Sequence, residues 1–247
     1  MVPSDDFRLS VQDASFAYPS ADTAALTRVS FQMEAGEIVG LVGPNGSGKS
    51  TLIRLIFNLM DRQDGTILIN GADHRSDIAR MEAIYLPSDN ELPEFLTGAE
   101  YLHVLAQLYR DSNCADESVV RAQFSSFGMD GRSGHLIEDY SHGMQKKLLL
   151  SSAFLLQRPL TVIDETLNGV DLDAVEVCKA EFSRMKARGG SLLLCSHDFS
   201  LLEEVADRVL ILRAGQLVAD LDTGAELANG GRLARSVREA LDCEERA

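Results

Sequence analysis

A glycine-rich segment between two apolar runs constrains this chain more than any other feature of its sequence. The segment from Gly43 to Ser50 reads GPNGSGKS and satisfies the pattern G-x-x-x-x-G-K-[ST]. The run EIVGLVG, typical of a buried strand, precedes it, and TLIRLI, typical of a helix, follows it. A strand, a glycine-rich loop and a helix in this order form the setting in which the motif binds phosphate.

The residue types of this loop predict how it would hold a nucleoside triphosphate. Glycines let backbone N–H groups converge on phosphate oxygens, and the helix N-terminus adds its dipole. We expect Lys49 to reach the β- and γ-phosphates, and to face solvent without ligand. The Ser50 hydroxyl would bind Mg²⁺, and Thr51 would face phosphate. The other residues expected to cradle phosphate are Gly43, Pro44, Asn45, Gly46, Ser47 and Gly48. Kinases, GTPases and motor ATPases all remain possible at this point.

Two carboxylates at the end of another apolar run narrow the chemistry. The run LTVIDE ends with Asp164 and Glu165. An acid at the carboxyl end of such a strand can hold the Mg²⁺ shell, so Asp164 is predicted to be a metal ligand. The adjacent Glu165 is predicted to orient and polarise an attacking water.

Apolar runs elsewhere predict an α/β fold, a P-loop NTPase core with a mainly parallel sheet and flanking helices. EIVGLVG, AIYLP, LTVIDE, SLLLCSH and VLILR look like strands buried on both faces, and helix-period stretches lie between many of them. Near the N-terminus, RLSVQDASFAY and RVSFQMEAG alternate apolar and polar residues. That alternation predicts an antiparallel β flank with one wet face, which GTILING could join. The segments DRQDG and GADHRSD are predicted to be turns.

Between residues 89 and 157 the strand pattern stops, which predicts a helical subdomain inserted into the core. AEYLHVLAQLY, DESVVRAQFSSF and the segment from Ser141 to Gln157 all read as helices, the last capped by its serine. In the tail, Leu233, Val237 and Leu241 would face inward from an exposed amphipathic helix. The expected division of the single domain, 1–247, is an α/β core with β flank at 1–88 and 158–220, a helical subdomain at 89–157 and a C-terminal helical tail at 221–247.

The segment DYSHGMQKKLLL carries a resemblance to a known family. Residues 140–144 align with L-S-G-G-Q, the signature of the ATP-binding cassette (ABC) ATPases, and depart from it at Tyr140, His142 and Met144. Ser141 and Gly143, whose hydroxyl and backbone would contact a γ-phosphate, are kept. Together with the phosphate loop and the carboxylate pair, this resemblance covers roughly residues 7–220.

The resemblance implies roles for further residues. Tyr18 stands where the family places an aromatic ring that stacks on adenine. Asp171 ends NGVD, which resembles the family's D-loop, and would face the opposite subunit. His197, in LLLCSHD, would approach the γ-phosphate. In the family two such domains sandwich two ATP molecules, each site pairing one chain's phosphate loop with the other chain's signature.

One departure from the family pattern falls at Ser88. The family usually has a glutamine at the end of YLPQ, whereas this chain has YLPS. That glutamine ordinarily touches Mg²⁺ and the attacking water and couples the site to a membrane partner. Ser88, here expected in the metal site, is too short to do this directly, so a bridging water or Asp89 would substitute.

Composition bounds the partners and the compartment. The formal net charge is −15, so the composition gives no sign of the positively charged surface that binds nucleic acid, and no nucleic-acid partner is expected. The N-terminus lacks the apolar core of a signal peptide, and the longest apolar stretch, LLLSSAFLL, is far below the ~18 residues of a membrane span. No disulfide, zinc site or C-x-x-C pair is expected of the four cysteines, which fit a reducing compartment as apolar fillers or surface thiols: Cys114, Cys178, Cys195 and Cys243.

The resemblance implies an ATP-binding and ATP-hydrolysing subunit of an ABC transporter. It would lie on the cytoplasmic face of the cell membrane, pair with an identical or paralogous cassette, and drive a separately encoded permease. YSHGM and LPEFLTGAEYL resemble the export-type branch. One alternative is a soluble ABC ATPase of translation or DNA repair, although such chains usually carry tandem cassettes or long coiled-coil or zinc insertions. The other is a P-loop small-molecule kinase, which leaves SHGM, VIDETLNGVD and CSHD unexplained.

Overall fold

A six-stranded sheet carries the apolar runs. The computed structural model describes residues 7–19, 23–61, 64–89, 91–110, 116–228 and 230–243. The strand order of the sheet is β10-β9-β3-β8-β7-β6, parallel throughout except that β10 runs antiparallel to β9. All five predicted runs form strands in it, which confirms the α/β core. Its strands are β3 (Ile38–Val42), β6 (Ala83–Leu86), β7 (Leu160–Asp164), β8 (Ser191–Cys195), β9 (Arg208–Arg213) and β10 (Gln216–Asp222).

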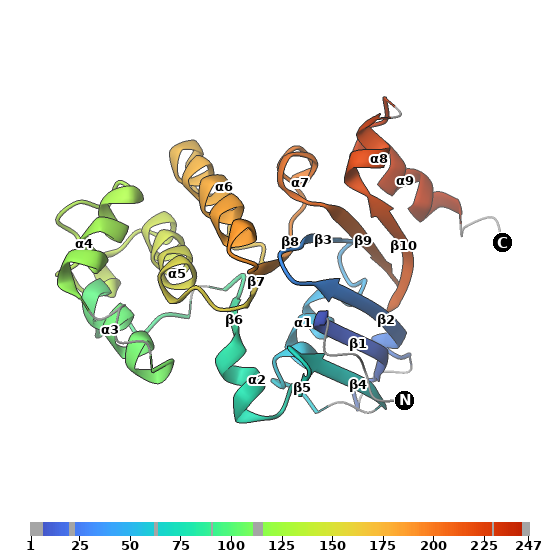
Figure 1. Cartoon of the computed structure of the whole chain (residues 1–247), viewed down its shortest axis with the longest axis horizontal. Helices are drawn as coiled ribbons and strands as arrows, with labels where there is room; N and C mark the ends of the chain where they lie inside the picture. The colour runs from blue at the N-terminus through green and yellow to red at the C-terminus, as the bar shows by residue number, and fades with distance from the viewer. Residues whose placement is uncertain are drawn as a thin grey trace.

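A second, antiparallel sheet forms the predicted flank (Figure 1). Its order is β2-β1-β4-β5, with β1 (Phe7–Phe16), β2 (Leu26–Glu34), β4 (Asp64–Ile69) and β5 (Ala72–Asp73). Buried and exposed residues alternate over most of β2, as the sequence pattern predicts for a strand with one wet face.

The segment GADHRSD is more than the predicted turn. It supplies β5, which pairs with β4, and then Ser76, whose side chain accepts from the N–H of Ala79 and caps helix α2 (Asp77–Glu82). Both elements have too few residues to show a periodic pattern in the sequence, so the prediction missed them.

The helices that follow β3, β7 and β8 cover the six-stranded sheet. α1 (Lys49–Ile56) starts directly after the glycine-rich loop, α6 (Leu172–Ala187) connects β7 to β8, and α7 (Phe199–Val205) connects β8 to β9. These crossovers bring the carboxyl ends of β3, β7 and β8 to one edge of the sheet, where ligands bind in open α/β folds.

Among the described residues between β6 and β7 there are helices and no named strand. They form α3 (Gly98–Leu108), α4 (Glu117–Ser126), a 3₁₀ helix η2 (Ile137–Asp139) and α5 (His142–Leu156), at the end of the molecule away from the antiparallel sheet (Figure 1). The three predicted helices are thus present. In α3, Leu102 is buried whereas Leu108 is 65% exposed.

Helix α5 ties this helical end to the core. Every residue from Leu148 to Leu156 is buried, so this part of the helix is covered on all sides. One hydrophobic cluster contains Phe124 from α4, Leu148 from α5 and Ile163 from β7, which makes the helical segment continuous with one face of the sheet. The division of the chain at residues 88 and 158 stays a prediction.

The tail folds back onto the last strands. α8 (Thr223–Ala228) and α9 (Leu233–Cys243) pack near β9 and β10, and α9 also contacts α7. Leu233 and Val237 are buried and Leu241 is half-buried, as predicted. Cys178 and Cys195 are buried, while Cys114 and the Cys243 side chain lie outside the described residues.

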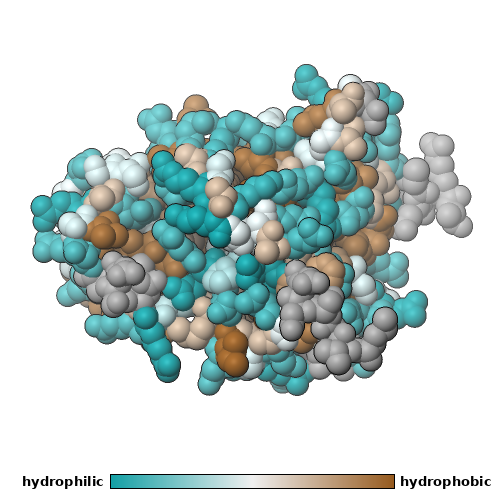
Figure 2. Space-filling model, in the orientation of Figure 1, coloured by the Kyte–Doolittle hydropathy of each residue, from teal (hydrophilic) through white to brown (hydrophobic). Residues whose placement is uncertain are grey.

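The face of the molecule drawn in Figure 2 is mostly polar outside the grey residues. Figure 2 shows apolar residues in small separate groups between polar ones on the face it presents. In the part of the chain that the structure describes, no helix has the length and apolar character needed to span a membrane.

Candidate nucleotide site

A cavity of about 440 Å³ lies at the carboxyl-end edge of the six-stranded sheet. It brings together the glycine-rich loop, one carboxylate from the end of β7, and an aromatic residue that follows β1. Ala25 also lines it, which the sequence analysis did not anticipate. The predicted site residues that line this cavity are Tyr18, Asn45, Gly46, Ser47, Gly48, Lys49, Ser50, Thr51 and Glu165.

The glycines of the loop are required by close backbone contacts. A Cβ on Gly43 would lie 2.1 Å from the carbonyl oxygen of Leu212. Gly48 has a φ of 106°, in the left-handed region, and a Cβ there would lie 2.7 Å from the carbonyl oxygen of Ala25. The loop therefore folds tightly against β9 and the start of β2, and α1 begins at Lys49 with its free N–H groups at the cavity.

Lys49 does not face solvent, contrary to the prediction. It is only 7% exposed, and its ammonium donates to the carbonyl oxygens of Gly43 at 2.8 Å and Pro44 at 3.3 Å. The expectation is wrong because the loop wraps its own carbonyls around the cation, a contact that no sequence pattern reveals. Beside it, the Ser47 hydroxyl is buried with no hydrogen-bond partner among the described residues. Phosphate oxygens would satisfy both groups.

Asp164 ends β7 as a buried carboxylate with donors from several elements. The Ser50 and Cys195 side chains hydrogen-bond to it, and the Tyr85 hydroxyl lies 3.5 Å from its Oδ2. Burial raises the pKa of Asp164, and the bonds from Cys195 and Ser50 oppose that shift. The meeting of a serine hydroxyl and a carboxylate supplies the hard oxygen ligands that Mg²⁺ takes, so these residues fit the ion.

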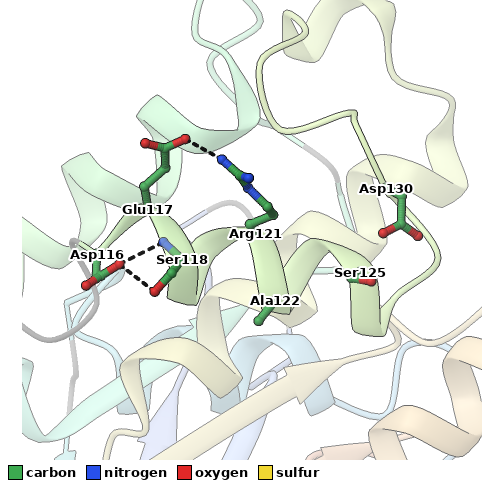
Figure 3. Close-up of a pocket in the computed structure, with 7 residues that line it drawn as sticks. All are labelled: Asp116, Glu117, Ser118, Arg121, Ala122, Ser125 and Asp130. Atoms are coloured by element: carbon green, nitrogen blue, oxygen red, sulfur yellow. Dashed lines mark hydrogen bonds and ion pairs between the residues drawn. The ribbon is translucent and has the colours of Figure 1, made fainter.

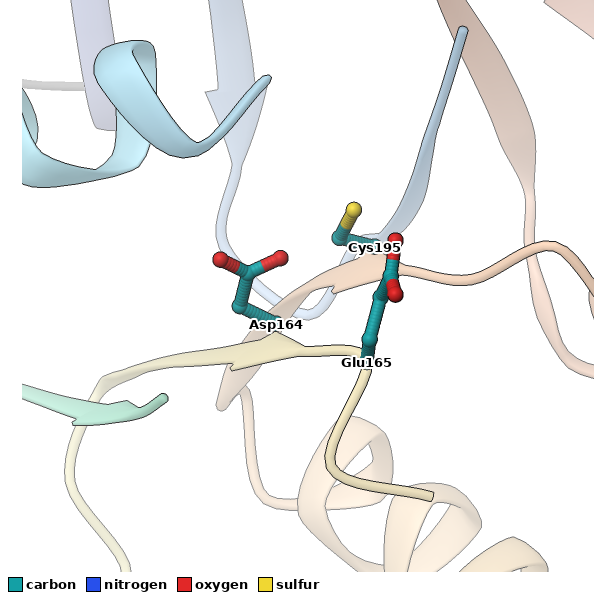
Figure 4. A group of neighbouring side chains, drawn as sticks. All are labelled: Asp164, Glu165 and Cys195. Atoms are coloured by element: carbon teal, nitrogen blue, oxygen red, sulfur yellow. The ribbon is translucent and has the colours of Figure 1, made fainter. Parts of the chain in front are cut away.

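Glu165 follows directly and points into the cavity from a strained backbone. Its φ is 57°, uncommon for a residue other than glycine, and its N–H donates to the carbonyl oxygen of Cys195 at 3.0 Å. One carboxylate oxygen lies 2.9 Å from Nε2 of His197, so the structure brings these two predicted residues together. Figure 4 shows the Asp164 and Glu165 carboxylates on the same side of the strand end, with Cys195 beside them.

Sequence reasoning missed two residues that touch Asp164. Tyr85 is the third residue of β6, before Leu86, and Cys195 is the last residue of β8. Cys195 is only 1% exposed, and its thiol pKa is raised by burial and by the charge of Asp164. It is therefore a buried thiol at the site rather than a surface one. The signal was its position at the end of a parallel strand, because such ends meet at one edge.

Eight predicted site residues lie outside the cavity lining: Gly43, Pro44, Ser88, Ser141, Gly143, Asp164, Asp171 and His197. Ser141 accepts from the N–H of Met144 and caps α5, and a Cβ on Gly143 would lie 3.9 Å from the carbonyl oxygen of Gly169. Asp171 caps α6 and binds the Lys147 ammonium at 2.6 Å. Ser88 is exposed in the loop after β6. Among the described residues of one chain, Ser141 and Gly143 therefore do not line the cavity that the phosphate loop lines.

A second hollow, at the start of α4, has a local explanation (Figure 3). Asp116 caps the helix through the N–H of Ser118, and Glu117 pairs with Arg121 at 2.7 Å. The contacts of Asp116, Glu117 and Arg121 thus lie within the first turns of α4 and stabilise the start of the helix.

Comparison with known proteins identifies the family. The family model described as "ABC transporter" matches residues 26–168, more than half of the chain. The ABC-type transporter ATP-binding protein EcsA of Bacillus subtilis (strain 168) is 34% identical over 213 residues, which cover 85% of each chain. The chain belongs to the ABC transporter family. As its ATP-binding subunit, it binds and hydrolyses ATP.

The matches to two further relatives of this ABC subunit cover different fractions of those relatives. A solved "ATP binding subunit of ABC transporter" has a TM-score of 0.87 and 31% identity, and the match covers 94% of this chain and 99% of that one. The Nod factor export ATP-binding protein I of Rhizobium meliloti (strain 1021) is 29% identical over 221 residues, covering 89% of this chain but only 66% of that protein. ATP-binding subunits of this family dimerise and pair with membrane permeases.

Proposed function

We propose that this chain holds Mg-ATP in the 440 Å³ cavity and hydrolyses it to power a separately encoded membrane permease. The observation that carries the proposal is the shared cavity, in which Glu165, paired with His197, faces the glycine-rich loop. A carboxylate beside a phosphate-binding loop can accept the proton of a water that attacks the γ-phosphate in line.

Tyr18, the glycine-rich loop and the first turn of α1 would bind the nucleotide. The Tyr18 ring, 37% exposed at the cavity, would stack on adenine, and its hydroxyl lies 3.1 Å from that of Thr51. The loop amides and Lys49 would bind the β- and γ-phosphates, with the Lys49 ammonium leaving its loop carbonyls for phosphate oxygens.

Hydrolysis would centre on Glu165. It accepts a proton from water as the water oxygen attacks the γ-phosphorus, and the bond from that phosphorus to the bridging oxygen breaks, so ADP leaves with the electron pair. His197 orients the Glu165 carboxylate and approaches the γ-phosphate. Ser50 and Asp164 would hold Mg²⁺, which when bound neutralises charge on the phosphates. Ser88 would contribute to the metal site through a bridging water.

Ser141, Gly143 and Asp171, which lie outside the cavity, are assigned to a second subunit's ATP. Ser141 and Gly143 would contact the γ-phosphate held by the opposite chain, and Asp171 would face that chain. The partner would be an identical or a paralogous cassette, and the pair would sit under the permease on the cytoplasmic face of the membrane. Export is the direction we favour, supported by the relative named for Nod factor export.

The catalytic assignment is tested by Glu165→Gln, with Lys49→Ala as its contrast. The amide keeps the shape of the side chain but cannot take a proton, so kcat should fall by at least about 10²-fold while ATP affinity persists. Lys49→Ala should lose both, because the cation on the phosphates is gone. Phosphate release and binding of a fluorescent ATP analogue separate the two. Wild-type turnover in Glu165→Gln would remove Glu165 from the mechanism.

The permease assignment needs a different experiment. Affinity purification of the chain in mild detergent should recover a polytopic membrane protein, and the recovery should survive a salt wash. Recovery of ribosomes or DNA-repair proteins instead would favour a soluble ABC ATPase.

A further inference from the structure

Thr166, the residue after Glu165, makes a buried link between two loops of the site. It is 0% exposed. Its Oγ1 lies 3.1 Å from the carbonyl oxygen of Leu86 and 3.0 Å from that of Pro87, and 3.5 Å from that of Asp164. A hydroxyl has one proton to donate, so the carbonyls of Leu86 and Pro87 share it in a three-centre hydrogen bond.

The link bears on Glu165 because that residue's backbone must be held in place. A left-handed φ of 57° persists in a glutamate only where the surroundings over-determine it. On one side the Glu165 N–H is bound to the carbonyl of Cys195, at the end of β8. On the other side Thr166 is bound to the end of β6. The segment that carries the carboxylate is thus fastened to both neighbours of β7.

We propose that Thr166 is a positioning residue, whose hydroxyl sets the direction of the Glu165 carboxylate by fastening its backbone to the loop that carries Ser88. This inference rests on the proposed role of Glu165. Thr166 does not line the nucleotide cavity, so it acts through Glu165 and not on ATP. Because Pro87 directly precedes Ser88, the same bond connects movement of that loop to the catalytic carboxylate, a connection for which the Ser88 side chain is too short.

Removal of the hydroxyl should affect turnover and leave binding intact. Without it, the Leu86 and Pro87 carbonyls lose a donor, and the turn at Glu165 is free to relax away from the 2.9 Å contact with His197. The hydrogen bonds of Thr166 go to the carbonyls of Leu86, Pro87 and Asp164, none of which lines the nucleotide cavity. The split between kcat and KM therefore distinguishes positioning of the carboxylate from general damage.

The test compares Thr166→Val, which has nearly the same shape without the hydroxyl, with Thr166→Ser, which keeps it. Thr166→Val should lower kcat about tenfold with KM for ATP unchanged, and Thr166→Ser should retain wild-type kcat. Hydrogen–deuterium exchange of the full chain without nucleotide gives a second readout. Peptides covering 86–89 and 165–168 should exchange faster in Thr166→Val than in Thr166→Ser or wild type.

Several results would overturn the inference. Wild-type kcat in Thr166→Val, or a Thr166→Ser variant as slow as Thr166→Val, would show that the hydroxyl has no role. A parallel loss of ATP affinity and melting temperature in Thr166→Val would mean that the residue only supports the fold. Thr166→Ala also lacks the hydroxyl, and should repeat the kcat loss if Thr166→Val does not fold. Glu165→Gln, measured alongside, separates the two proposals: full turnover there removes the catalytic assignment, whereas an inactive Glu165→Gln beside a fully active Thr166→Val removes only the role of Thr166.

Discussion

Asp164 shows how single residues from distant parts of the chain shape the site. Its carboxylate is buried and receives side-chain hydrogen bonds from Ser50 on α1, Tyr85 on β6 and Cys195 on β8. Burial disfavours the ionised carboxylate, while these donors favour it. In the proposed Mg²⁺ site, the charge of the cation would offset the remaining cost of burial.

A prediction at this scale concerns Ser88. Replacement by glutamine, the residue usual in the family, should raise kcat several-fold, because the longer side chain can reach the metal and the attacking water. Ser88→Ala is the matched control and should lower kcat only if a water bridged by the serine hydroxyl contributes. Steady-state phosphate release measures both. If both variants turn over at the wild-type rate, position 88 has no part in catalysis.

At the scale of elements, the strands were predictable because they are buried on both faces. Runs such as LTVID and SLLLC are apolar throughout, and every residue of β7 and β8 is buried. Short elements such as β5 and α2 escaped prediction because two to six residues show no period. The contacts of Lys49, Tyr85 and Thr166 were not predicted, because they depend on how the chain folds in three dimensions. No local sequence pattern shows which strands are neighbours in the sheet.

A second prediction concerns the start of α6. Asp171 accepts from the N–H of Ala174 and binds Lys147, so Asp171→Ala should lower the free energy of unfolding by about 1–2 kcal/mol. Asp173→Ala, in the same first turn but without a capping bond, is the control and should change it by less than about 0.5 kcal/mol. Urea denaturation measures both. Equal midpoints for the two variants would contradict the capping role.

The charge of Asp171 gives this difference a pH dependence. The hydrogen bond from Lys147 lowers the pKa of Asp171 in the folded chain. A carboxylate with a lowered folded pKa contributes stability above its unfolded pKa, and that contribution is lost as pH falls through the folded value. The gap between wild type and Asp171→Ala should therefore shrink in acid.

At the scale of the whole molecule, the proposed dimer would build each site from two chains. The cavity holds the phosphate loop and Glu165, whereas Ser141, Gly143 and Asp171 lie elsewhere. Beside Asp171, Leu172 is 84% exposed, an apolar side chain at the surface that the proposed dimer would cover.

Dimerisation should become visible when hydrolysis is blocked. Glu165→Gln with saturating Mg-ATP should elute from size-exclusion chromatography as a dimer, because uncleaved ATP would stay bound between the two chains. Adding Ser141→Arg should restore the monomer by blocking the opposed surface. Ser183→Arg, also exposed but near the far end of α6, is the control and should leave the dimer intact. A dimer indifferent to Ser141→Arg would exclude the head-to-tail arrangement.

The strand order has a consequence for the sequence of events during synthesis. β3, which leads into the phosphate loop, pairs only with β8 and β9 in the described part of the chain. Both partners lie beyond residue 190, whereas β3 ends at Val42. During synthesis, the strand that leads into the phosphate loop is therefore made before either strand that it pairs with. We expect β3 to take its place between β8 and β9 only after both of those strands have been made.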